Sequence, residues 1–131
     1  MSVRETMDYL KERCKAVVYS IPEKDWNNLI DLIISKEKIF IYGSGRSGLI
    51  GQLFSVRMVQ LGLRVYFVGD MTTPIIGRND LTILVSNTGQ TMSVVRTAEI
   101  ARRVGSHVVS LTSSASSRLA MNSDAAIILK I

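Results

Sequence analysis

The sequence predicts an α/β protein with a three-layer, doubly wound parallel sheet of five strands, in the flavodoxin-like order 2-1-3-4-5, preceded by an N-terminal helical hairpin. Short apolar runs rich in Val and Ile recur from residue 37 onward. They do not alternate apolar with polar residues, as the strands of a sheet with one solvent-exposed face do. Segments with helical spacing separate most of these runs. Residues 1–36 carry helical spacing alone.

The N-terminal part, residues 1–36, is expected to form two helices. Apolar residues recur at intervals of four and three along the first, at Val3, Met7, Leu10, Cys14 and Val17. This narrow stripe packs either on the chain's own core or on another subunit. Cys14, the only cysteine, is expected to be a buried small hydrophobe. Pro22 suits the first turn of the second helix. The apolar face of that helix carries Trp26, Leu29, Ile30 and Ile33.

Residues 37–131 are expected to form the α/β core, and at 131 residues the whole chain is predicted to be one domain. The predicted strands are KIFIYG, RVYFVG, LTILVS, HVVSLT and AAIILKI. Residues 46–61 and 91–104 have helical spacing, whereas residues 116–121 leave room only for a short helix. The connection over residues 69–80 is rich in Gly, Thr and Pro, and it is expected to cross over as a loop.

Gly62 and Gly105 come just after the two longer core helices. Glycine commonly follows a helix because it adopts the left-handed conformation there without steric cost. We therefore expect both residues to have positive φ.

Two loops rich in glycine and hydroxyl groups follow the first and third predicted strands. They are GSGRSG at residues 43–48 and SNTGQT at residues 86–91. In an open doubly wound sheet, ligands bind beyond the carboxyl ends of the strands where the strand order reverses, which here lies between these two strands. Topology and composition therefore select the same place for a ligand.

The first loop has glycines in GxGxxG spacing, at Gly43, Gly45 and Gly48. This spacing lets a backbone approach an anion closely at the N-terminus of the following helix. Asp70 lies near the end of the second strand, where a ribose-binding acid is expected in dinucleotide-binding folds. The loop alone therefore leaves dinucleotide binding open.

The second loop has no charged side chain and several hydroxyls. One Ser or Thr suffices to cap the next helix, a contribution of about 1 kcal/mol, which leaves the other polar side chains unexplained. A phosphate held between the two loops explains them. The predicted phosphate-binding residues are Ser44, Ser47, Ser86, Asn87, Thr88, Gly89 and Thr91. Gly45 and Arg46 are candidates for a sugar contact, and Arg46 is otherwise a subunit contact or a solvated first-turn residue.

Through YGSGRSGL, VGDMTTP, LVSNTGQTMSVV and LTSSASSRLA, the chain resembles the sugar isomerase (SIS) family of phosphosugar-binding domains, and within it the 6-phospho-3-hexuloisomerases. The resemblance covers nearly the whole chain. It implies aldose–ketose isomerisation of a 6-phospho-3-hexulose, no cofactor, and a homo-oligomer, either a dimer or a tetramer. It assigns phosphate-binding hydroxyls to Ser47, Ser86, Thr88 and Thr91, and local polarity to Asn87.

Departures from the family's pattern bear on catalysis. Gln90 stands where the family usually has Glu, and the hexuloisomerases continue past the position of Ile131 with a segment that carries the expected base, also a Glu. Asp70 is the only acid placed for the pocket, as a candidate catalytic residue or simply a loop-capping one. His107 begins the fourth strand, opposite the ligand end. Two functions remain, an isomerase and a non-catalytic sugar-phosphate-binding or regulatory module, with a dinucleotide-binding protein as a third.

Composition argues against several other classes of partner. The net charge is +5, but the 16 Lys and Arg residues form no block and do not alternate with aromatic residues, so no specific nucleic-acid binding is expected. No paired Cys and His spacing suits a metal ion. No stretch approaches the roughly 18 to 20 apolar residues of a membrane span, and the N-terminus lacks the apolar region of a signal peptide. We therefore expect no metal, no membrane partner and a cytoplasmic location.

Overall fold

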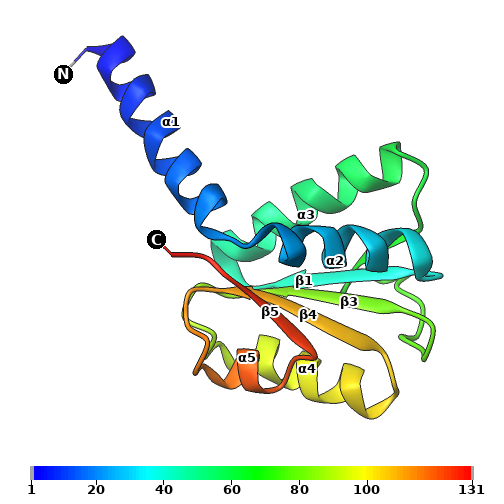
Figure 1. The fold of residues 1–131 in the computed structure, drawn as a ribbon. Coiled ribbons are helices and arrows are strands. Elements are labelled where there is room, and N and C mark those ends of the chain that lie inside the picture. The colour runs from blue at the N-terminus through cyan, green and yellow to red at the C-terminus, as the bar shows by residue number, and fades with distance from the viewer. Residues whose placement is uncertain (1, 131) are drawn as a thin grey trace.

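The computed structural model of the chain describes residues 2–130, in which strands and helices alternate after two N-terminal helices (Figure 1). The strands are β1 Ile39–Gly43, β2 Val65–Phe67, β3 Leu81–Val85, β4 His107–Thr112 and β5 Ala125–Ile128. The helices are α1 Val3–Ser20, α2 Glu23–Ser35, α3 Gly45–Gln60, α4 Met92–Arg103 and α5 Arg118–Met121. The connection from β2 to β3 is a loop, as predicted.

The five strands form one parallel sheet in the order β2-β1-β3-β4-β5, which confirms the predicted fold. One face of the sheet is covered by α2 and α3, through a core that includes Leu29 and Met58. The other face is covered by α4 and α5, through a core that includes Val94 and Leu119. Helices therefore shield both faces of the sheet from water, which explains why the strands are continuous apolar runs.

The glycines that follow the two longer core helices have the predicted conformation. Gly62 and Gly105 have φ of 92° and 91°. Each comes just after the residue that caps its helix, Leu61 for α3 and Val104 for α4. The ends of both helices are thus fixed by local sequence.

The first helix departs from the predicted hairpin. α1 has no buried residue and runs away from the rest of the chain instead of folding back on α2 (Figure 1). Ile21 and Pro22 between the helices have extended ψ angles of 127° and 139°, and proline favours this conformation in the residue before it. The chain thus changes direction there. The prediction that Cys14 is buried is wrong, because its helix has no core to pack on within the chain and the thiol is exposed.

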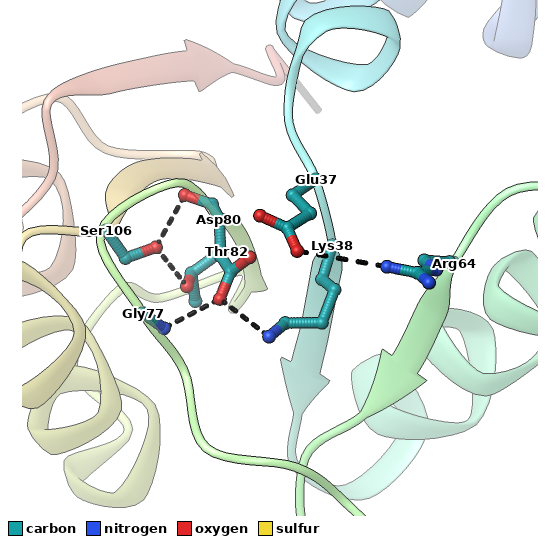
Figure 2. Close-up of polar contacts among 7 residues, drawn as sticks. All are labelled: Glu37, Lys38, Arg64, Gly77, Asp80, Thr82 and Ser106. Carbon is teal, nitrogen blue, oxygen red and sulfur yellow. Dashed lines mark hydrogen bonds and ion pairs between the residues drawn. The ribbon is translucent and has the colours of Figure 1, made fainter.

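A polar cluster fixes the amino end of the sheet (Figure 2). The Asp80 side chain accepts a hydrogen bond from the amide of Gly77 at 2.7 Å and lies 3.6 Å from Lys38 Nζ. Asp80 is only 2% exposed. The hydroxyl of Ser106 lies 2.9 Å both from the Asp80 carbonyl oxygen and from the Thr82 hydroxyl. These contacts tie the long β2–β3 loop to the base of the sheet, at the end opposite the two glycine and hydroxyl loops.

Candidate functional site

The two candidate loops lie side by side beyond the carboxyl end of the sheet. Gly43 and Val85, the last residues of β1 and β3, are paired in the parallel register. Each loop leads directly into a helix, because α3 begins at Gly45 and α4 at Met92. The N-termini of α3 and α4 therefore open at the same edge of the sheet, at the point where the strand order reverses.

The glycines of the first loop allow α3 to approach β1 closely. A Cβ atom at Gly48 would lie 2.5 Å from the carbonyl oxygen of Gly43, and one at Gly43 would lie 3.0 Å from that of Val85. Gly45 has a φ of 58°, which favours glycine. The GxGxxG spacing is thus accounted for by packing and backbone conformation in the loop itself.

The side chains between these glycines are available to a ligand. Ser44 is exposed and makes no hydrogen bond that caps α3. Ser47 is half-buried in the first turn, and Arg46 is exposed. The structure thus places the predicted residues of the first loop at one helix N-terminus.

The second loop is held in a tight turn by its own hydroxyls. Ser86 is 3% exposed, and its Oγ accepts a hydrogen bond from the amide of Gly89 at 3.1 Å. The same oxygen lies 3.1 Å from Thr91 Oγ1. Thr91 is the N-cap residue of α4, yet its side chain makes no capping hydrogen bond. Thr88 is exposed, and its hydroxyl accepts from the amide of Gln90 at 3.2 Å. A role as helix cap therefore does not account for the hydroxyls of this loop.

The end of β4 and the loop after it hold the second loop in place by hydrogen bonds. The carbonyl oxygen of Asn87 accepts hydrogen bonds from the amide of Ser113 at 3.0 Å, from its hydroxyl at 2.6 Å and from Thr112 Oγ1 at 3.2 Å. The roles of Thr112 and Ser113 were not predicted from the sequence. The run LTSSASS was the available signal, because β4 is the neighbour of β3 in the predicted order.

Gly89 is fixed both by its conformation and by the space around it. Its φ is 69°, and a Cβ atom there would overlap the side chain of Ser117. The Gly89 carbonyl oxygen accepts a hydrogen bond from the amide of Leu119 at 2.9 Å. The second loop therefore has little freedom to change shape around a ligand.

The electrostatics of this edge favour an anion. The first turns of α1 and α2 carry acidic residues, namely Glu5 in α1 and Glu23 and Asp25 in α2, whereas the first turns of α3 and α4 carry none. The first amides of a helix have no partner within it, and they give its N-terminus a partial positive charge. Two uncompensated N-termini and several hydroxyls therefore meet at one place.

Asp70 lies apart from this arrangement. It is exposed in the loop after β2 and lines a hollow of about 450 Å³ that Gln52, Tyr66 and Thr73 also line. None of the predicted phosphate-binding residues lines this hollow. The Asp70 carbonyl oxygen accepts from the amide of Thr73 at 3.0 Å, so the residue helps to shape its own loop. His107 begins β4, at the amino end of the strand.

Residues 2–130 lack the features of two other kinds of site. No helix among them is long and apolar enough to cross a membrane. They also contain no group of three or more His, Cys, Asp or Glu side chains that could hold a metal ion.

Comparison with known proteins places this geometry in a family. The family model of the SIS domain matches residues 32–131. The chain belongs to the SIS domain family. The match begins within α2 and includes both candidate loops, while α1 lies outside it.

Curated relatives of this SIS domain include named isomerases. The chain is 38% identical over 115 residues to a 3-hexulose-6-phosphate isomerase of Methanocaldococcus jannaschii, covering 85% of this chain and 64% of the relative. It is 32% identical over 117 residues to a 3-hexulose-6-phosphate isomerase of Bacillus subtilis, covering 89% of this chain and 63% of the relative. The chain thus spans less than two thirds of the length of these two proteins.

Solved structures show the same fold. A hypothetical protein of Methanococcus jannaschii, for which its crystal structure infers a function of 3-hexulose-6-phosphate isomerase, has a TM-score of 0.85 at 34% identity, with 97% of this chain and 73% of that chain covered. A protein of E. coli CFT073 has a TM-score of 0.78 at 25% identity, with 98% of this chain and 74% of that chain covered.

Proposed function

We propose that this SIS domain binds a sugar phosphate, with the phosphate held between residues 43–48 and residues 86–91. The observation that carries the proposal is the meeting of two helix N-termini, without acidic residues in their first turns, beside a loop rich in hydroxyls. Helix N-termini bind phosphate through their free amides and their positive dipole end. Glycines at positions 43 and 48 keep the two loops close to the sheet, so the site lies at its edge.

The proposed donors to the phosphate are those predicted from sequence. Thr88 is exposed and Thr91 is half-buried, so both hydroxyls can reach a ligand from the second loop. The Ser86 oxygen accepts from the Gly89 amide and shares a hydrogen bond with Thr91 Oγ1, so the proton of one of these two hydroxyls remains to be donated to a ligand. Ser44, Ser47, Asn87 and Gly89 complete the predicted set, and Arg46 would face the sugar. The amides of Gly89 and Gln90 already donate to Ser86 Oγ and Thr88 Oγ1 within the loop.

We infer further that the activity associated with this site is isomerisation of a 6-phospho-3-hexulose. The names of the relatives in Methanocaldococcus jannaschii and Bacillus subtilis support this substrate class. Isomerisation through an enediol requires a base within hydrogen-bond reach of the sugar carbon. Asp70 is the candidate within this chain, although the hollow that it lines contains none of the phosphate-binding candidates.

A non-catalytic sugar-phosphate-binding module is the second candidate. One observation favours it: residues 43–48 and 86–91 contain no carboxylate and no histidine, and Gln90 is an amide. A site built only from these loops holds an anion and supplies no base. Binding without turnover is then the expected behaviour of the chain.

A thermal-shift panel run beside a coupled isomerase assay tests both candidates. Fructose 6-phosphate and arabinose 5-phosphate are expected to raise the melting temperature, because a ligand that binds only the folded state stabilises it. Fructose and NAD are the controls, and neither is expected to shift it. A shift with NAD and none with sugar phosphates would overturn the proposal. Turnover in the coupled assay would select the isomerase, and binding without turnover would select the module.

We also propose that the chain forms a homo-oligomer, a dimer or a tetramer, and that the site needs no cofactor. The exposed apolar residues of α1 support self-association. Sedimentation at micromolar concentration measures it, and a monomer under those conditions would contradict it.

A further inference from the structure

Helix α3 has its small residues on the inside and its large apolar residues on the outside. The residues that it buries are Gly48, Gly51, Ser55 and Met58. A Cβ atom at Gly51 would lie 3.2 Å from the Ile41 side chain, so the helix packs closely on the sheet. This contact leaves the larger side chains of α3 without a place in the core.

The opposite side of α3 is an exposed apolar surface, which we call the α3 outer face. Its apolar residues are Leu49, Ile50, Leu53, Phe54, Val56 and Val59, together with the capping residue Leu61, each at least 43% exposed, and the exposed polar residues Arg57 and Gln60 lie among them. Contiguous exposed apolar patches on soluble proteins commonly mark interaction sites. The α3 outer face is therefore expected to be covered by a partner.

Helix α1 presents a second apolar surface, which none of residues 2–130 covers. Its exposed large apolar residues are Val3, Met7, Tyr9, Leu10, Val18 and Tyr19. The helix has 18 residues and none of them is buried. In proteins most of the stability of a helix comes from tertiary packing of its apolar face, and α1 has no such packing within residues 2–130.

The two surfaces match in length, and together they supply the area that a specific interface needs. At 1.5 Å per residue, α1 and α3 are about 27 Å and 24 Å long, so one can lie along the other over its full length. A helix is about 10 Å wide, so one such contact covers about 240 Å² on each helix. Two equivalent contacts therefore bury about 1,000 Å², which is the lower limit for a specific association.

We propose that α1 of one copy lies along the α3 outer face of a second copy, and that the second copy returns the same contact. α1 leads away from its own domain, so it cannot cover its own α3 (Figure 1). A two-fold arrangement buries both surfaces on both copies and closes the assembly. The inference specifies the surface for the self-association proposed above, and it does not depend on what the site binds.

Cys14 allows a direct test without a substitution. It is the only cysteine, it is exposed, and it lies on the apolar stripe of α1. A benzophenone coupled to its thiol is expected, on illumination, to crosslink to the tryptic fragment 47–57 of α3. Mixing unlabelled protein with ¹⁵N-labelled protein identifies crosslinks between copies by mass spectrometry. Crosslinks confined to one copy, crosslinks to fragments outside α3, or none between copies would overturn the proposal.

Surface variants give an independent readout. Leu53→Glu, at a residue that is 69% exposed on the α3 outer face, is expected to weaken self-association at least tenfold by sedimentation. Met121→Glu, at a residue that is 73% exposed on α5, is the matched control and is expected to leave it unchanged. Equal effects of the two variants would refute the proposal, as would a wild-type monomer. Circular dichroism confirms that each variant is folded, and the thermal-shift panel reports sugar-phosphate binding separately.

Discussion

Replacing Gly89 with alanine tests whether the second loop is held as rigidly as its contacts indicate. The φ of 69° costs a non-glycine residue about 1–2 kcal/mol. The new methyl group would also overlap the side chain of Ser117 and lie 2.9 Å from Thr112 Oγ1, and overpacking of this kind costs about 1–3 kcal/mol. Together these effects predict a loss of about 2–5 kcal/mol in the free energy of unfolding.

Gly62→Ala is the matched control for this variant. Gly62 has a φ of 92°, but a Cβ atom there meets nothing within 4 Å. Only the conformational cost of about 1–2 kcal/mol is expected. Urea unfolding followed by circular dichroism measures both variants, and the difference between them isolates the contact with the loop after β4. If Gly89→Ala loses no more stability than Gly62→Ala, the second loop can yield, and its description as a fixed turn is wrong.

Other predictions concern binding and the base of the sheet. Ser86→Ala and Thr88→Ala are each expected to weaken sugar-phosphate binding by about 1–3 kcal/mol in calorimetry, and unchanged affinity in both would leave the loop without a ligand role. Affinity is expected to fall below pH ~6, where the phosphate becomes a monoanion; a flat profile from pH 5 to 8 argues against recognition of the dianion. Asp80→Ala leaves the Gly77 amide and Lys38 without their partner and is expected to cost about 1–3 kcal/mol in urea unfolding, with ligand affinity of the folded protein retained.

The α/β core could be predicted from sequence because its signals are local. Each strand is a short apolar run bounded by a polar residue or glycine, and the dry faces of the parallel sheet allow such runs to remain continuous. Gly62 and Gly105 mark the ends of two helices, because glycine adopts the left-handed conformation there more easily than other residues do. Strand order then placed both candidate loops at one edge, and the register of Gly43 with Val85 confirms that they are neighbours.

The course of α1 could not be predicted in the same way. A stripe of apolar residues indicates that one face of a helix is to be covered, but not which surface covers it. Cys14 lies on that stripe, and its burial was inferred for the isolated chain, in which the helix has no partner. The support of Asn87 by Ser113 was missed for a related reason, since the contact joins residues far apart in sequence and depends on the relative positions of two loops.

Two carbonyl groups of the second loop, those of Asn87 and Gly89, accept hydrogen bonds from the chain behind them, and this bears on which ions the loop can hold. The Asn87 oxygen accepts three hydrogen bonds and the Gly89 oxygen accepts one, all from the polypeptide behind them. A bound cation would need such oxygens as ligands, and here they are already occupied. These two carbonyl oxygens are therefore engaged by the chain itself. The hydrogen bonds that give the loop its shape thus also engage two of the oxygens that a cation would use, and they do so without a charged side chain.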